Sequence, residues 1–162
     1  EDTAGNGRND ASMSQERASE CSNDPWPPYC CVILRDLTGR YLLEKRPGTA
    51  RVAAGTLTCF GGKRERGETP AQCVRRELSE ELAFDRAGTV GALERTVTLR
   101  ASDGRLVAWF FRAEAPSGSV RALEAGYGAV WLTAEELTAA PLSPWHRAAL
   151  EGERAGLREV VG

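Results

Sequence analysis

The chain has 162 residues, and its 21 lysines and arginines nearly balance its 23 aspartates and glutamates. This length suggests one domain with a sizeable core, and the balanced charge gives no general attraction to nucleic acid or to an anionic membrane. No apolar run approaches ~20 residues, and no basic segment precedes an apolar one at the N-terminus. We therefore expect neither a membrane-spanning helix nor a secretory signal.

The cysteines stand at positions 21, 30, 31, 59 and 73. Their number is odd and their spacing matches no zinc site. Cys30 and Cys31 are neighbours in an apolar run and should point to opposite faces of a strand. We interpret the cysteines as reduced thiols, which suits a cytoplasmic location.

Residues 1–24 are rich in small and polar side chains and carry almost no large apolar ones. Such a segment cannot bury enough surface to offset the entropy of ordering, so we predict a disordered leader. The run Pro25-Trp26-Pro27-Pro28 predicts a stiff, extended approach to a single domain over residues 25–162.

The first part of this domain is predicted to form strands around a loop. Tyr29 to Arg35 is β-branched and aliphatic and predicts a strand, and Arg40 to Arg46 predicts its hairpin partner. Residues 47–55 predict a loop. Leu57 to Phe60 predicts a short strand that leads into two glycines.

A helix start follows at Thr69-Pro70-Ala71-Gln72. Thr69 can cap the helix, Pro70 suits its first position and Gln72 completes a capping box, so we predict a helix to about Leu82. On a helical wheel, four apolar residues gather on one side: Ala71, Val74, Leu78 and Leu82. Three acids gather on an adjacent arc: Glu77, Glu80 and Glu81.

Carboxylates at i, i+3 and i+4 repel one another unless a cation joins them, and their Cβ atoms should lie ~5–6 Å apart. This spacing suits Mg²⁺ or Mn²⁺, hard ions that bind carboxylates together with water and phosphate oxygens. Gly61 and Gly62 allow a sharp turn that could bring a carbonyl to the ion, which makes Gly61 a candidate ligand. For the helix alone, a solvated acidic face is the alternative.

The second part predicts strands over residues 89–101, 106–113 and 129–132, the first two joined by a hairpin turn. A second capping box, Thr133 to Glu136, opens a short helix, and a last helix runs from Ser143 to about Arg154. His146, the only histidine, is expected to be exposed near that helix start. Strands and helices do not alternate strictly, which predicts an α+β fold with a mixed sheet and helices on its faces.

The segment from Gly62 to Phe84 resembles the box of the Nudix hydrolase superfamily, G-x5-E-x7-R-E-U-x-E-E-x-G-U, in which U is aliphatic. Seven positions match at the right spacing: Gly62, Glu68, Arg76, Glu77, Leu78, Glu80 and Glu81. Phe84 is aromatic at the last U. Ala83 replaces the glycine, which should cost roughly 1 kcal/mol if a left-handed helix end is kept. The resemblance implies an α/β/α sandwich with a mixed sheet, in which the box forms a loop-helix-loop.

The resemblance also implies roles for the box residues. Glu77, Glu80 and Glu81 would bind the metal, and Glu68 would be a further ligand through water. Glu77 and Glu80 are also catalytic candidates, because one carboxylate would accept a proton from the attacking water. Arg76, also a catalytic candidate, would act with Glu68 to fix the loop against the helix.

Further candidates lie outside the box. In the MutT branch of the family an acid precedes a tryptophan-containing strand, and Glu124 holds a similar place as a metal ligand or base. A solvated loop acid is the alternative. Arg46 stands where such enzymes contact the base, with an ordinary surface arginine as the alternative. Trp109 and Phe111 share one face of a strand and could stack on a nucleobase, although core packing is the default.

The substrate is less well marked. Residues 97–103 lack the proline of ADP-ribose enzymes and the tyrosine of dinucleoside polyphosphate enzymes, and Leu142-Ser143 and Cys59 depart from the MutT residues that read 8-oxoguanine. We expect Mg²⁺-dependent hydrolysis of a diphosphate bond in a nucleoside diphosphate linked to another moiety, first a nucleoside triphosphate. A dinucleotide or nucleotide-sugar is the alternative substrate, and a non-catalytic nucleotide-sensing module the alternative function. The expected partner is a small nucleotide, with no membrane, and the charge disfavours nucleic acid.

Overall fold

A computed structural model describes residues 24–85 and 88–162. All but Asp24 of the predicted leader, residues 1–24, lies outside the described residues, and the division into a leader and one domain stays a prediction. Arg64 contacts the segment that precedes the first strand. Its side chain pairs with Asp24, donates to the carbonyl of Pro27 and stacks on Trp26.

A mixed sheet of eight strands forms the centre of the described part. Its order starts at one edge with β10 (Glu159–Val161), β6 (Glu94–Arg100) and β7 (Leu106–Glu114), and continues through β1 (Tyr29–Arg35) and β2 (Tyr41–Lys45) to β3 (Leu57–Thr58). In addition, β4 (Phe60–Lys63) pairs with β1, and β9 (Gly128–Leu132) pairs with β2. β1 is parallel to β7 and antiparallel to β2 and β4.

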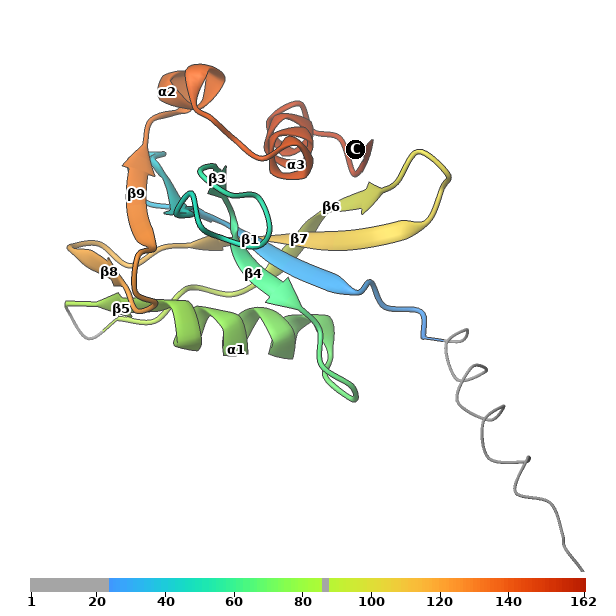
Figure 1. The fold of residues 1–162 in the computed structure, drawn as a ribbon, viewed down its shortest axis with the longest axis horizontal. Helices are drawn as coiled ribbons and strands as arrows, with labels where there is room; N and C mark the ends of the chain where they lie inside the picture. Colours follow the sequence, from blue (N-terminus) through green and yellow to red (C-terminus); the bar gives the residue numbers. More distant parts are fainter. Residues whose placement is uncertain (1–23, 86–87) are drawn as a thin grey trace, which may run out of the picture.

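Helices cover both faces of this sheet, as Figure 1 shows. α1 (Pro70–Glu81) lies on one face, over a core that includes Phe60. α2 (Ala134–Ala139) and α3 (Pro144–Arg154) lie on the other face, over a second core that includes Leu150. The predicted α/β/α sandwich with a mixed sheet is confirmed.

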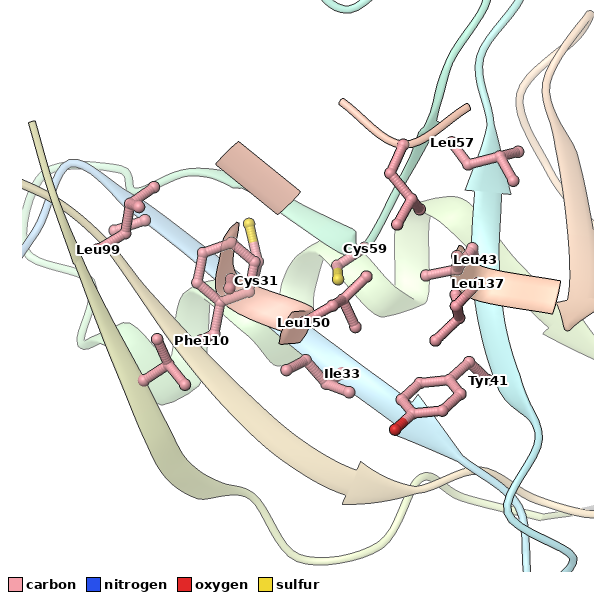
Figure 2. Packing of buried hydrophobic residues seen from close by; sticks show 14 of the residues in the cluster. Cys31, Ile33, Tyr41, Leu43, Leu57, Cys59, Leu99, Phe110, Leu137 and Leu150 are labelled. Carbon is pink, nitrogen blue, oxygen red and sulfur yellow. The ribbon is translucent and has the colours of Figure 1, made fainter. Parts of the chain in front are cut away.

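Alternation along β1 separates the two cores. Cys31 and Ile33 belong to the core under α2 and α3, and Cys30 and Val32 belong to the core under α1. Figure 2 shows part of the first of these cores, in which Cys31 lies beside its pairing partner Phe110 of β7. Both faces of β1 are therefore buried, which explains its continuous apolar run.

β1 and β2 diverge along their length. Leu34 and Arg35 of β1 pair with β2, whereas residues 29–32 of β1 pair with β4. The chain between β3 and β4 passes at Cys59 from β2 to β1. β1 and β2 are therefore neighbours at one end of the sheet and are separated by a gap at the other.

α1 begins as predicted. The Thr69 hydroxyl accepts a hydrogen bond from the Gln72 N–H, and the Gln72 side chain accepts one from the Thr69 N–H, so the capping box forms. Ala71, expected on the apolar side, is exposed, and Cys73 is buried in its place. The buried arc runs through positions 70, 73 and 74, which leaves Ala71 at its edge.

The end of α1 differs from the predicted left-handed cap. The cap residue Leu82 is extended, with φ −129° and ψ 139°, and the chain passes at once into β5 (Leu82–Phe84), which pairs with β8 (Val120–Ala122). Ala83 pairs with Arg121 in this ladder. Among the described non-glycine residues, only Ala53 has a positive φ. No glycine is needed at position 83, so the predicted cost of alanine does not arise.

The other boundaries follow the prediction with four differences. The segment from Leu57 to Phe60, expected as one strand that leads into the glycines, is divided between β3 and β4, and Gly61 and Gly62 lie inside β4. β6 begins at Glu94 rather than at residue 89, and β8 and β10 were not predicted. Strands of three residues are too short for an alternating pattern to show. The second capping box forms between Thr133 and Glu136 and opens α2. Within the two described ranges, the search for membrane spans finds no helix with the length and apolar character to cross a bilayer.

Candidate active site

A cavity of about 790 Å³ lies at the gap between β1 and β2. This volume falls in the range of small-molecule sites. Its wall combines acids, two glycines, the loop after β2, and side chains of β7 and α3, among them Glu44, Glu81, Glu124, Gly61, Gly62, Phe110 and His146.

Gly61 and Gly62 let β4 approach both β1 and α1. Gly61 has a φ of +142°, and a Cβ there would collide with the Cys30 carbonyl and lie 2.6 Å from Cys31 Cα. A Cβ on Gly62 would lie 2.6 Å from Cδ of Glu77. Glycine is therefore needed at position 61 because of the backbone, and at position 62 because of an acid of α1.

Arg76 joins the loop before α1 to the acids of the helix. Its Nε and Nη2 donate to the two carboxylate oxygens of Glu68 at 2.7 and 3.1 Å. Its Nη1 donates to Glu77 at 3.0 Å and to Glu80 at 3.3 Å. The hydrogen bonds from Arg76 hold the pKa of Glu68 at about 2 and raise the pKa of Arg76. The structure thus brings together Arg76 and Glu68, the pair expected to orient the loop.

Arg76→Lys should loosen this loop. The lysine donors radiate from one nitrogen, so they cannot reach both oxygens of Glu68 and also Glu77. We expect the free energy of unfolding to fall by about 1–2 kcal/mol, and hydrolysis to fall by about tenfold or more. Urea denaturation and an activity assay measure both effects. Arg66→Lys, an exposed change on the same loop, is the control; equal behaviour of the two variants would contradict the prediction.

Glu81 is half-buried close to two other acids. Its Oε2 accepts a hydrogen bond from the Gly61 N–H at 3.3 Å. Burial, followed by the charges of Glu44 and Glu77, raises the pKa of Glu81 to about 9. Glu44 is 4% exposed, and burial raises its pKa although the Arg46 guanidinium opposes this. Carboxylates that repel one another in a buried place are expected where a cation binds.

The pairing of β5 with β8 places Glu124 in the cavity wall near Glu44 and Glu81. These strands pair directly after α1, and the N–H of Leu123 donates to the carbonyl of Glu81 at 2.9 Å. After burial, the charge of Glu124 is among the causes that raise the pKa of Glu44. The structure therefore brings Glu124 together with Glu81 and Glu44.

Glu80 lies apart from these acids. Its side chain is 57% exposed and accepts a hydrogen bond from Arg76. One helical step of about 100° separates it from Glu81 and turns it toward solvent. The structure leaves Glu80 on the solvent side of Arg76 and outside the cavity wall.

Arg46 lines the cavity, and its side chain bonds to neighbouring protein groups. Nη1 donates to Glu44 at 2.7 Å, and Nε donates to the carbonyl of Val52 at 2.8 Å. Its guanidinium also lies 5.2 Å from the ring centroid of Tyr127. Arg46, expected to contact a base, therefore serves in this structure to neutralise Glu44 and to hold the loop after β2.

Trp109 and Phe111, expected to contact the substrate, share one face of β7, but this face is turned toward α1. Phe111 is buried in the α1 core, and Trp109 packs against that core with the Arg95 guanidinium 4.3 Å from its ring centroid. Phe110 lines the cavity instead. Alternation predicted which aromatics share a face but could not predict which face holds the site.

His146, expected to be exposed, lines the cavity at the start of α3. Its Nδ1 accepts a hydrogen bond from the backbone N–H of Cys59 at 3.0 Å, and its ring meets the Phe110 ring edge-on with 5.5 Å between centroids. Burial, and to a lesser extent the charge of Arg46, lowers the pKa of His146 to about 4. The imidazole is therefore neutral at neutral pH.

The neutral His146 should make the protein less stable in mild acid. Its folded pKa of about 4 lies below the ordinary value of 6.5, so the unfolded chain binds the proton first as the pH falls. Between pH 6.5 and 4 this lowers the stability by on the order of 2 kcal/mol. His146→Gln keeps an acceptor for Cys59 and should remove this part of the pH dependence. Denaturation at pH 7 and pH 4.5 measures it, and parallel profiles would contradict it.

Glu44 and Thr58 were not predicted as parts of the site. They pair across β2 and β3, and both are buried. Leu42 and Glu44 share a face of β2, because residues two positions apart in a strand point the same way. Since Leu42 points inward, this spacing could have indicated that Glu44 also points inward. The Thr58 hydroxyl is buried without a hydrogen-bond partner among the described residues, which points to a bound group or water beside it.

The donor set at this end of the cavity fits a hard divalent cation. Glu44, Glu77 and Glu81 supply carboxylate oxygens beside the glycine backbone, which is the chemistry that Mg²⁺ and Mn²⁺ prefer. Over residues 24–85 and 88–162, no three acidic, histidine or cysteine side chains converge on one ion as they lie. Glu77 bonds to Arg76 instead, so an ion would share this carboxylate with the guanidinium.

A mixed sheet between helical layers, with an acid-bearing loop and helix at one cavity, is the arrangement found in the Nudix hydrolases. The family model described as the NUDIX domain matches residues 25–152, so the chain belongs to the Nudix family. It is a Nudix-type pyrophosphohydrolase, a hydrolase that acts on acid anhydrides. Nudix hydrolases generally use divalent metal ions and act on nucleotide-type small molecules.

Solved structures of other proteins are similar to this chain over most of its length. It is 30% identical to the MutT Nudix hydrolase from Burkholderia pseudomallei, over 76% of this chain and 94% of that one, with a TM-score of 0.52. The E. coli ORF135 protein is 29% identical over 78% and 87%, with a TM-score of 0.52. The MutT protein from Methanosarcina mazei Go1, 21% identical over 82% and 96%, shares the fold with a TM-score of 0.62. The search of curated proteins gives no match.

Proposed function

We propose that this protein hydrolyses a diphosphate bond in a nucleoside diphosphate linked to another moiety, with Mg²⁺, and that nucleoside triphosphates losing pyrophosphate are the first substrates. The observation that carries the proposal is one cavity whose wall contains the acids Glu44, Glu81 and Glu124 together with the uncharged rings of Phe110 and His146. A nucleotide has matching parts, since its phosphate chain binds a metal held by carboxylates and its base is uncharged.

In this proposal Glu44, Glu77 and Glu81 hold Mg²⁺, Glu68 and Glu80 contribute through water, and Gly61 contributes through its backbone. The bound ion would neutralise charge on the diphosphate and acidify the attacking water. Arg76 keeps the Glu68 and Glu77 carboxylates in place.

Three acids are candidates for the group that accepts the proton from that water. Glu77 and Glu80 are already bonded to Arg76. Glu124 lines the cavity and forms no ion pair within the described ranges. We therefore assign the role of general base to Glu124, because an acid without a cationic partner is the better proton acceptor.

The experiment is a panel of nucleoside triphosphates, dinucleoside polyphosphates, ADP-ribose and NADH, each with Mg²⁺ or Mn²⁺ and each with EDTA. The proposal expects nucleoside monophosphate and pyrophosphate from at least one triphosphate, with no turnover in EDTA. Turnover of a dinucleotide or nucleotide-sugar alone would replace the first substrate. Tight binding without any turnover would favour a nucleotide-sensing module, and neither binding nor turnover would overturn the nucleotide assignment.

A further inference from the structure

The loop after β2, residues 46–56, forms part of the cavity wall and has a fixed shape. Its lining residues are Arg46, Pro47 and residues 49–53. The Ala53 carbonyl accepts hydrogen bonds from the N–H and the hydroxyl of Thr56, at 3.2 and 2.6 Å. Ala53 also has a φ of 51°, the one positive value among the described non-glycine residues. Backbone of this kind persists where its surroundings hold it, and it is concentrated at ligand sites.

The backbone of this loop leaves donors unpaired rather than acceptors. The carbonyls of Pro47, Val52 and Ala53 all accept hydrogen bonds from other groups of the loop. The N–H groups of Arg51, Val52 and Ala53, in contrast, donate to no protein acceptor over residues 24–85 and 88–162. Successive N–H groups that are left unpaired carry partial positive charge and attract anions. The loop therefore gives this side of the cavity an electropositive backbone.

Arg51 adds a full positive charge to the same loop. Two arginines line the cavity, Arg46 and Arg51, and they differ in their partners. Arg46 forms an ion pair with the buried Glu44. Arg51 is exposed, and within the described part of the chain it forms no ion pair and no side-chain hydrogen bond. Its guanidinium is therefore the cation of the described wall that is free to bind a ligand.

We infer that Arg51 and the N–H groups of this loop bind the anionic group that lies beyond the cleaved bond, and so select substrates in which that group is a phosphate. This inference rests on the proposed function and chooses between its first and its alternative substrates. A metal held by the acids would neutralise charge at the cleaved bond, but a terminal phosphate carries further charge that needs a partner of its own. A guanidinium binds two phosphate oxygens at once. An uncharged sugar in the same place would gain nothing from Arg51.

The selectivity can be measured with pairs of substrates that share a base, namely GTP with GDP-mannose and UTP with UDP-glucose. We expect Arg51→Gln to lower kcat/KM for the triphosphate by about tenfold or more, and that for the nucleotide-sugar by less than about twofold. Arg51→Lys keeps the charge and should stay within about threefold of the wild-type protein on both. An equal loss on both members of a pair would mean a structural role for Arg51 and overturn the inference.

Calorimetry with magnesium tripolyphosphate measures the same contact without a base and without turnover. Arg51→Gln should bind this probe about tenfold more weakly than the wild-type protein. Arg66→Gln is the matched control, because it removes an exposed arginine that lies outside the cavity wall. It should change the affinity by less than about twofold. Equal weakening in both variants would indicate a general effect of net charge, and this result would count against an anion site on the loop.

The outcomes distinguish this inference from the proposed function. If the wild-type protein releases pyrophosphate from a triphosphate and Arg51→Gln does so equally well, the inference is wrong and the proposed function stands. If the wild-type protein turns over no nucleotide but binds tripolyphosphate through Arg51, the proposed function fails and the anion site remains.

Discussion

Glu81→Gln should abolish turnover and at the same time make the metal-free protein more stable. Glu81 is half-buried, accepts a hydrogen bond from Gly61, and is repelled by Glu44 and Glu77. Glutamine keeps the shape and an acceptor for Gly61, but it supplies no charge to a cation, so we expect activity to fall by about 10³-fold or more. With a pKa of about 9, Glu81 must take up a proton from neutral solution when the metal-free protein folds, and glutamine removes this cost. In EDTA the free energy of unfolding should therefore rise by on the order of 1–2 kcal/mol.

Glu80→Gln is the matched control, because it makes the same chemical change on an exposed residue of the same helix. The Glu80 side chain lies outside the cavity wall and is 57% exposed, so its loss of activity should be about tenfold at most, with no gain in stability. Pyrophosphate release and urea denaturation in EDTA compare the two variants. If Glu80→Gln were the more damaging, the assignment of Glu81 as the main ligand would be wrong. A less stable Glu81→Gln protein would contradict the argument from repulsion.

The parts of the site predicted from the sequence are those that local chemistry determines. Thr69 and Gln72 define the start of α1 through contacts within four residues, and helical spacing alone puts Glu77 and Glu81 one turn apart. Arg76 and Glu68 were paired through the resemblance to the Nudix box. These residues required no knowledge of how the strands pair.

The parts that were missed depend on contacts between distant segments. Glu44 faces Glu81 only because β2 diverges from β1 and pairs with β3, and His146 meets Cys59 across 87 positions of the chain. Alternation in β7 gave two possible faces, and only the placement of α1 shows that Phe110, not its neighbours, borders the cavity. Ala83 was read as a departure because a helix end was expected where the chain begins a strand.

The adjacent glycines of the loop should fail in different ways when each is changed to alanine. At Gly61 the φ of +142° is one that side chains rarely adopt, and the new Cβ would meet the backbone of Cys30 and Cys31. That backbone cannot move without breaking the β1–β4 ladder, in which Gly61 pairs with Cys31. We therefore expect Gly61→Ala to lower the free energy of unfolding by about 3 kcal/mol or more.

Gly62→Ala should leave the fold nearly intact and damage catalysis. The new methyl would meet the carboxylate of Glu77, the end of a flexible side chain, which can rotate away at the cost of its hydrogen bond to Arg76. We expect a loss of about 1 kcal/mol in stability and of about 10²-fold in activity, because Glu77 would leave the position proposed for metal binding. Urea denaturation and pyrophosphate release on both variants test the contrast. Full activity in Gly62→Ala would show that catalysis does not require Glu77 in its present position. Wild-type stability in Gly61→Ala would show that the backbone of β4 can shift beside β1 without cost.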